Sequence, residues 1–489
     1  MQKNNIQGIV LAAGKSTRLK TGRSKLLEPI CGREMVSYPT KLLDELDMPI
    51  TMIIGYQGDL IKKALDRYKF KDITFVEQKE QKGTGHALLC SKKTWSADDI
   101  LIINGDAPLV HAETIEKLCY EHTKNNATIS FVTANHSDPL VANYGRVIKE
   151  KNIIKIVEPA NFTGDDVSES CWINGGIYLV KKDFLEKAID DIPKDSISKE
   201  FYLTDLVRLA GEKKHTIKTV SVPFDCIRGI NTMYELWAAE QIKRSQLIRF
   251  WMGEGVRFEL AQNAHIDSDV KIGAGTRVCL GSQLLGTTSI GKGCTIGSHS
   301  IILNSTLEDN VTVLPYSYIV NSKIYDNAQV GPFVHIKNSS EIKPNATIGN
   351  FVEIKKSIIG QNTKAKHLSY IGDTTIGSNV NIGAGTITCN HNGKQKNKIK
   401  IEDNAYIGSN SSLIAPIKIG KGAFTAAGSV INKNVPENAL AIARSRQENK
   451  ADYANKIIGK TTRNKKENKD EAPFIGAIKS KDATTISTE

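Results

Sequence analysis

The segment Ser289-Ile290-Gly291-Lys292-Gly293-Cys294-Thr295-Ile296-Gly297 carries the same aliphatic-glycine pair twice, with one hexapeptide step between the copies. The step recurs over residues 266–432. It fits neither the 3.6-residue turn of an α-helix nor the two-residue alternation of a strand. It is typical of a parallel β-helix, in which each coil has three faces and each face points one aliphatic side chain inward. At about 18 residues a coil, roughly ten coils are expected, stacked at ~4.8 Å. Further examples of the step are Ile376 and Ile382, and the run Ile401, Ile407, Leu413 and Ile419.

Composition places the chain among multidomain globular proteins. Its 489 residues are too many for one ordinary core, so two or three domains are expected. No apolar run is long enough for a membrane span, and the first residues lack the layout of a signal peptide. The 8 cysteines are scattered without a CxxC pair, which argues against a zinc site or a disulfide framework. We therefore expect a cytoplasmic protein.

The formal net charge is +12, so nucleic-acid binding is one interpretation. Basic clusters interleaved with aromatic residues are absent, and part of the excess lies in a lysine-rich segment near residue 465. Anionic small substrates are a sufficient explanation for the charge. We expect no nucleic-acid partner.

The order of apolar segments predicts four regions: an α/β domain over residues 1–230, a linker helix over 231–252, the β-helix over 253–444, and a polar, largely disordered tail over 445–489. In the first region, apolar strands alternate with helices, which indicates a parallel sheet covered on both faces. The expected strands are 6–13, 49–54, 73–77 and 100–104, and the expected helices include 38–46 and 59–68.

The loop after the first strand, Leu11-Ala12-Ala13-Gly14-Lys15-Ser16-Thr17-Arg18, turns tightly at a glycine and is followed by Lys25. Backbone N–H groups of such a turn, with Arg18 and Lys25, suit a phosphate. It is not a Walker A loop, because that motif needs a glycine where Ile9 stands.

This pattern resembles the loop of sugar-1-phosphate nucleotidylyltransferases, which carry a Rossmann-like sheet. Gln78 and Gly83-Thr84-Gly85-His86 resemble the base-reading loop of the uridylyl members. Asp106 ends a strand where open parallel sheets place ligands, although on spacing alone a helix-capping carboxylate was the simpler interpretation. The resemblance implies that Asp106 and Asn231 hold Mg²⁺, which favours oxygen ligands and keeps several waters. It assigns the nucleotide and sugar to Leu11, Ala12, Ala13, Gly14, Arg18, Lys25, Gln78, Gly83, Thr84, Asn104, Gly105, Asp106, Gly145, Glu158, Asn174 and Asn231.

Three segments interrupt the hexapeptide repeat: Gly349–Lys356, Lys366–Asp373 and Asn381–Asn390. In succession they are similar to the acetyltransferase half of the bifunctional N-acetylglucosamine-1-phosphate uridylyltransferase and glucosamine-1-phosphate N-acetyltransferase family. The similarity of the whole chain covers residues 1–444 in order. It implies a left-handed β-helix, a homotrimer with shared acetyl sites, and cytoplasmic synthesis of UDP-N-acetylglucosamine for the bacterial peptidoglycan and lipopolysaccharide.

Acetyl transfer to an amine needs a base, and a histidine suits that role near pH 7. The resemblance makes His367 this base. A lone histidine is more often structural, so the assignment depends on the surrounding motif. Direct transfer is preferred over an acyl-enzyme on Cys389. The resemblance assigns the acetyl acceptor to Lys337, Lys355, Tyr370, Asn381 and Lys396, and acetyl-CoA to Ala384, Asn390, His391, Ser409, Ala427 and Arg444.

The sequence departs from the family pattern at several site positions. His335 and Lys337 stand where arginines are usual, and a lysine offers a point charge in place of a bidentate fork. Ser24, Asn104, Gly175 and the pair Ala160-Asn161 also differ, which puts the detail of the sugar pocket in doubt. Two alternatives stay open: a monofunctional nucleotidylyltransferase with a structural β-helix, and an inactive scaffold with the same fold.

Overall fold

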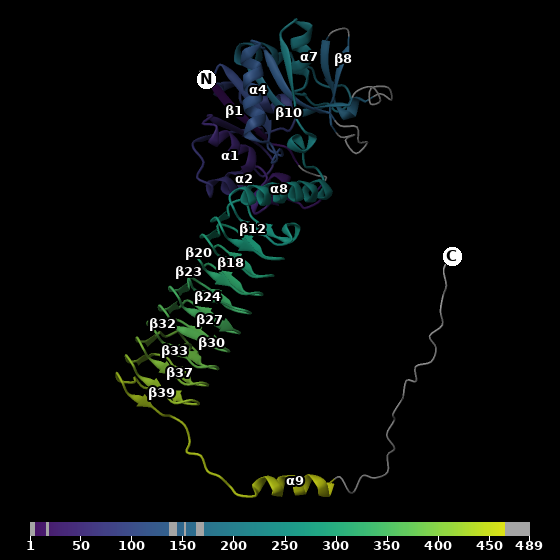
Figure 1. Cartoon of the computed structure of the whole chain (residues 1–489). Helices are drawn as coiled ribbons and strands as arrows, with labels where there is room; N and C mark the ends of the chain where they lie inside the picture. The colour runs from purple at the N-terminus through teal and green to yellow at the C-terminus, as the bar shows by residue number, and fades with distance from the viewer. Residues whose placement is uncertain (1–4, 16–18, 136–143, 151–152, 163–170, 465–489) are drawn as a thin grey trace, which may run out of the picture. The chain divides into compact units, whose positions relative to one another are not determined.

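The structure is a computed structural model, and it describes all residues except 1–4, 16–18, 136–143, 151–152, 163–170 and 465–489. The described chain forms two compact units, Met1–Ile442 and Ala443–Glu489. The first unit contains an α/β domain and the β-helix, which are coloured purple to teal and teal to yellow-green in Figure 1.

The α/β domain is built on one mixed sheet with the strand order β11-β7-β10-β6-β1-β4-β5. β1 pairs in parallel with both β4 and β6, as the apolar strands predicted. The expected parallel sheet has one exception among these strands, because β10 runs antiparallel to both β6 and β7. The strands are β1 (Ile6–Ala12), β4 (Ile50–Ile54), β5 (Ile73–Glu77), β6 (Asp99–Asn104), β7 (Ile129–Asn135), β10 (Trp172–Lys181) and β11 (Ile217–Ser221).

Both faces of this sheet are covered by helices, since its central strands are apolar on both sides. One face packs on α1 (Ser37–Glu45), α2 (Gly58–Asp66) and α4 (Ala112–Lys124). The other packs on α3 (Thr84–Cys90), α6 (Lys182–Ala188) and α7 (Asp205–Glu212). A hairpin of β8 (Arg146–Glu150) and β9 (Ile153–Val157) joins the sheet beside β10.

The segment predicted as an amphipathic helix forms α8 (Met233–Gly253). A capping box begins it, with the Thr232 hydroxyl accepting from the Glu235 backbone and the Glu235 carboxylate accepting from the Thr232 backbone. Among the helices of the described residues, none is long and apolar enough to cross a membrane.

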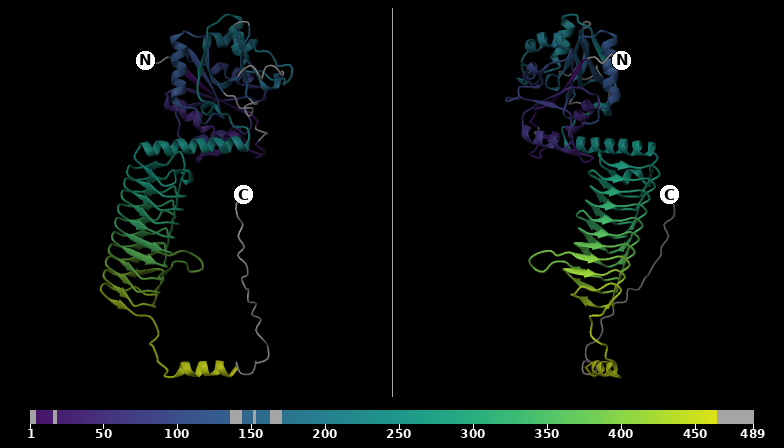
Figure 2. Two further views of the ribbon diagram at one scale, coloured as in Figure 1. Left: turned by 45° about the vertical axis from the view of Figure 1, so that its right-hand side comes forward. Right: turned by 90° about the vertical axis from the view of Figure 1, so that its left-hand side faces the viewer.

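The hexapeptide repeat forms the predicted β-helix, visible as stacked coils in Figure 2. Its strands make three parallel sheets, one for each face of the coil. The 11-stranded sheet runs from β12 (Arg257–Phe258) to β41 (Leu440–Ala441). The 10-stranded sheet runs from β13 (His265–Ile266) to β40 (Val430–Ile431), and the 9-stranded sheet from β14 (Lys271–Ile272) to β38 (Ile417–Ile419).

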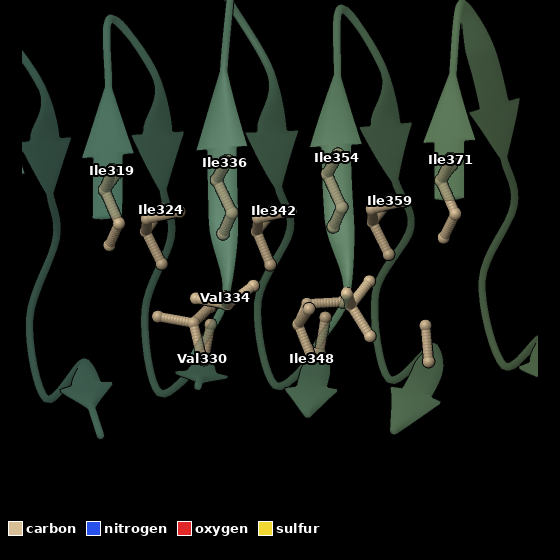
Figure 3. Close-up of a cluster of buried hydrophobic side chains, with 14 of the residues drawn as sticks. Ile319, Ile324, Val330, Val334, Ile336, Ile342, Ile348, Ile354, Ile359 and Ile371 are labelled. Carbon is tan, nitrogen blue, oxygen red and sulfur yellow. The ribbon is translucent and has the colours of Figure 1, made fainter. Parts of the chain in front are cut away.

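The inward aliphatic side chains stack in columns along the β-helix, as Figure 3 shows for Ile319, Ile336, Ile354 and Ile371. A second column, Ile324, Ile342 and Ile359, comes from the 9-stranded sheet. All of these side chains are fully buried, so one isoleucine at each repeat fills the interior. Because the inward side chains are aligned in this way, the outward residues at equivalent positions of neighbouring coils are aligned as well.

The tail contains a helix. Tyr453–Asn464 form α9, inside the segment that was expected to be largely disordered. The sequence of α9 lacks the apolar spacing of a long amphipathic helix. A helix this short shows little hydrophobic periodicity from which it could be predicted. Residues 465–489 lie outside the described part of the chain.

Candidate active sites

The first candidate site lies at the carboxyl ends of β1 and β6, where two hollows meet. One, of about 410 Å³, is lined by residues of the loop after β1, by Lys25 and Gln78, and by Gly83. The other, of about 230 Å³, is lined by Gly145, Glu158, Asn174 and Asn231. Three side chains, those of Thr84, Asn104 and Asp106, line both hollows.

Thus the structure brings the predicted nucleotide and sugar residues together around Asp106. Leu11, Ala13 and Gly14 line the first hollow, whereas Ala12 and Gly105 lie in the backbone beside the lining without contributing to it. Arg18 lies outside the described residues.

Lys25 joins the two predicted metal ligands. Its Nζ donates to Asp106 Oδ2 and, at 2.8 Å, to Asn231 Oδ1. The side chains of Lys25 and Asp106 are each only 18% exposed, which makes their ion pair stronger than a surface pair. The helix-capping interpretation of Asp106 is excluded, because the N-cap of the next helix, α4, is His111.

The donor set fits a divalent cation of the kind that nucleotidyltransferase domains use. The oxygens of Asp106 and Asn231 point at one common place, since both accept from the same ammonium. No cluster of three His, Cys, Asp or Glu side chains able to hold a metal occurs in the described ranges. A cation here would therefore rely on few protein ligands, with substrate phosphates and water completing its shell.

The loop carrying Gly83 and Thr84 is held rigidly against the second half of the domain. Gln78 Nε2 donates to the Gly83 carbonyl at 3.1 Å and lies 2.9 Å from His86 Nδ1. Gly83 has φ 101°, and a Cβ there would lie 2.5 Å from the Phe201 carbonyl oxygen. The position therefore requires glycine, and the buried Gln78 fixes the turn at the mouth of the first hollow.

In the second hollow, burial raises the pKa of Glu158, and Thr204 Oγ1 donates to its carboxylate at 2.9 Å. Asn174 sits at an irregularity of β10, where its Nδ2 donates to the Tyr178 hydroxyl at 2.6 Å. Each of the two predicted side chains is therefore held in place by a hydrogen bond to a neighbour. Each can still form further hydrogen bonds with a ligand in the hollow.

Sequence reasoning missed four polar residues of this hollow: Tyr144, Tyr178, Tyr202 and Thr204. The Tyr144 hydroxyl accepts from the Gly229 N–H at 2.8 Å, and burial raises its pKa to about 12. Its place beside Gly145 in Asn143-Tyr144-Gly145-Arg146 was a usable signal. Thr204 gave none, because only the fold brings it to Glu158.

The second candidate site follows one edge of the β-helix. His367 ends β30 (Lys364–His367), at the corner between the 11-stranded and 10-stranded sheets. The inward residues Ala365, Ile382, Ile407 and Thr425 pair in register from coil to coil. Two residues beyond each of them stand His367, Ala384, Ser409 and Ala427, which form a column that we call the corner column.

Three of the residues assigned to acetyl-CoA thus lie in line with the proposed base, one on each successive coil. At the ~4.8 Å spacing of paired strands, this column suits an extended ligand lying along the rod. Neither Ser409 nor Ala427 is buried.

The acceptor residues occupy the two sheets that meet at this corner. Lys337 and Lys355 pair in register between β25 (His335–Lys337) and β28 (Glu353–Lys355). Tyr370 begins β31 (Tyr370–Gly372) of the same sheet, whereas Asn381 begins β33 (Asn381–Ile382) of the neighbouring one. The lysine that replaces the usual arginine is held by an ion pair, with Lys337 Nζ 2.8 Å from Glu353 Oε1.

The remaining assigned residues fall on a loop and on the tail. Asn390 is buried, and its Nδ2 donates to Asp373 Oδ2 at 2.6 Å. His391 and Lys396 form an isolated antiparallel bridge and are exposed. They lie in the extra length between β34 (Ile387–Cys389) and β35 (Ile399–Ile401), the loop that leaves the coils in Figure 2. Arg444 belongs to the second compact unit, so its role stays a prediction.

Known families match both halves of the chain. Residues 8–152 match the MobA-like NTP transferase domain. Residues 398–433 match the bacterial transferase hexapeptide (six repeats), and residues 287–313 match the hexapeptide repeat of succinyl-transferase. A nucleotidyltransferase domain followed by a hexapeptide-repeat transferase domain defines the chain as a bifunctional transferase.

Similar proteins show the family to which the chain belongs. The chain is 38% identical to "Bifunctional protein GlmU" of Thermotoga petrophila, over 90% of this chain and 97% of that protein. It is 38% identical to the protein of that name from Koribacter versatilis, over 91% and 96% of the two chains. The Clostridium botulinum protein is 36% identical over 92% and 98%. The chain belongs to the bifunctional GlmU family.

Proposed function

We propose that the two sites catalyse successive steps: acetyl transfer from acetyl-CoA to glucosamine-1-phosphate on the β-helix, and uridylyl transfer from UTP to N-acetylglucosamine-1-phosphate on the α/β domain. The observation that carries this assignment is the meeting of two hollows at Asp106, because a nucleotide and a sugar phosphate must approach one reacting phosphorus from two sides. The cofactor that we infer is Mg²⁺, held by Asp106 and Asn231.

In the uridylyl step, a phosphate oxygen of the sugar phosphate forms a bond to the α-phosphorus of UTP. The bond between the α-phosphorus and the oxygen that bridges it to the β-phosphate breaks. Pyrophosphate leaves. The attacking phosphate is already an anion, so no general base is needed. What the site must supply is alignment and positive charge. The backbone at Gly14 and the ammonium of Lys25 supply charge to the phosphates, while Glu158 and Asn174 orient the sugar. Mg²⁺, when bound, neutralises charge on the phosphates.

In the acetyl step, the amine of the sugar attacks the thioester carbonyl, and His367 takes the proton that the amine loses. The C–N bond forms, the C–S bond breaks, and the same proton passes to the departing thiolate. Lys337 and Lys355 attract the phosphate of the acceptor. Cys389 lies within β34 and takes no part.

The corner column lies on the outside of the β-helix, where His367, Ser409 and Ala427 are exposed, which supports a shared site between copies of the chain. We propose a homotrimer in which neighbouring β-helices enclose acetyl-CoA. The chain has eight free cysteines and no disulfide in its described residues, which supports a cytoplasmic location.

The test follows free thiol and pyrophosphate separately in a mixture of protein, substrates and Mg²⁺. With N-acetylglucosamine-1-phosphate supplied, Asp106→Ala should abolish pyrophosphate release and leave thiol release from glucosamine-1-phosphate intact. His367→Ala should do the reverse. If either change silences both reactions in a folded oligomer, the two-site assignment is wrong. Pyrophosphate release by a wild-type protein that never consumes acetyl-CoA would favour a monofunctional nucleotidylyltransferase.

A further inference from the structure

One contact of His367 has no part in the site described so far. His367 Nδ1 lies 3.0 Å from the side-chain oxygen Oδ1 of Asn350. Asn350 ends β27 (Thr347–Asn350) and pairs with His367 in the parallel register of β27 and β30. It occupies, one coil earlier, the same position in the corner column.

The surrounding backbone fixes this pair in place. The Leu368 N–H donates to the Asn350 carbonyl at 3.0 Å, and the Ser369 hydroxyl donates to the His367 carbonyl at 2.9 Å. A Cβ added at Gly349 would lie 1.9 Å from the Lys366 carbonyl oxygen, so the glycine permits the close approach of the two strands. Because both side chains leave adjacent, immobilised backbones, their contact is built into the coil.

An amide oxygen can only accept a hydrogen bond, so Nδ1 must carry the ring proton in this contact. The other ring nitrogen, Nε2, then holds a lone pair. The partner of one imidazole nitrogen sets the role of the other, and a ring in the wrong tautomer cannot take a proton where the reaction needs it.

We propose that Asn350 is the positioning residue of His367: it holds the proton on Nδ1 and leaves Nε2 as the base of acetyl transfer, an inference that rests on the proposed function of His367. The amine proton moves to Nε2, the Nδ1–H bond stays intact, and the imidazolium donates a stronger, charge-assisted hydrogen bond to Asn350. The proton on Nε2 then passes to the thiolate of coenzyme A.

The test replaces Asn350 in the full-length protein by leucine, which has a similar size and no acceptor, and by aspartate, which keeps one. Asn350→Leu should lower kcat for thiol release by about 10- to 100-fold, the range found when the hydrogen-bond partner of a metal-ligating histidine is removed. The KM values for both substrates should change much less. Asn350→Asp should restore most of the lost rate and move the acid limb of the pH profile upward, since a carboxylate favours the imidazolium.

A double variant separates positioning from a general structural effect. If Asn350 acts only through His367, adding Asn350→Leu to His367→Ala should not lower the residual rate further. Thr347→Val, a substitution of similar size on the same strand, is the matched control and should leave kcat unchanged. Pyrophosphate release should stay at the wild-type level in all variants.

Three results would overturn the proposal: wild-type kcat in Asn350→Leu, no recovery in Asn350→Asp at any pH, or additive losses in the double variant. A His367→Ala protein that keeps full thiol release would instead overturn the proposed function. The two failures are therefore distinguishable.

Discussion

The two sites of this chain are built in opposite ways. On the α/β domain, Lys25, Asp106 and Asn231 come from distant parts of the sequence and converge where two hollows meet. On the β-helix, His367, Ala384 and Ser409 occupy one repeated position on successive coils. A sheet edge with loops around it can enclose a substrate within one chain. A solenoid edge offers only a line of contacts, which is why we propose that a second copy of the chain completes the enclosure.

The largest effect is expected in the enclosed site. Lys25→Met removes the ammonium that lies against Asp106, and the loss of one charge-stabilising donor in a preorganised site costs ~10²–10³ in rate. Pyrophosphate release should fall by about this factor at saturating Mg²⁺, while thiol release stays unchanged. A loss of less than threefold would mean that the rate of uridylyl transfer does not depend on this buried charge. It would contradict the contrast between an enclosed site and an open one.

The next effect concerns the support of the open site. Ile359 is fully buried in the β-helix, whereas its neighbour Ile358 on the same strand is 37% exposed. Ile359→Ala should destabilise the β-helix by about 2–5 kcal/mol, because a cavity adds to the lost burial. Heating should then inactivate acetyl transfer at a lower temperature and spare uridylyl transfer. Ile358→Ala is the matched control and should leave both inactivation temperatures nearly unchanged.

The smallest effect is expected at a partly exposed ion pair of the 10-stranded sheet. Lys337 pairs with Glu353 on the surface and offers a single charge to the acceptor phosphate. Lys337→Met should raise KM for glucosamine-1-phosphate about tenfold, or roughly 1.4 kcal/mol, with kcat little changed. The difference from wild type should shrink as salt is added, since salt screens exposed charges. A salt-independent effect on kcat would place Lys337 at the reacting atoms.

The sequence predicted the β-helix well because every coil repeats the same local rule, so a period measured along the chain gives the neighbours in space. The alignment of Ala384, Ser409 and Ala427 with His367 came instead from the strand register of the structure, because the coils between them differ in length. The α/β sheet was predicted less completely, since the antiparallel pairing of β10 depends on non-local contacts that no window of sequence records. For the same reason Glu158 was predicted and its partner Thr204 was not.

The predicted site residues came from motifs, and the contacts between them came from the fold. Asn350 lies in the segment Gly349–Lys356, but the sequence assigned it no role. Its role became visible only when the structure placed it beside His367 of the next coil. The helix α9 was not predicted for a different reason: its composition is polar, and its 12 residues are about the length below which an isolated helix is marginal.

The longer coil that carries His391 and Lys396 has a consequence for how this architecture can change. Ile376 pairs with Ile359 on one side and with Ile401 on the other, so the interior remains continuous although the chain between Ile376 and Ile401 makes a detour. Adding residues to such a loop costs little, since the entropy of closing a loop grows only slowly with its length. Insertions and deletions at a corner can therefore change the ligand-binding surface of the β-helix while its interior packing stays the same.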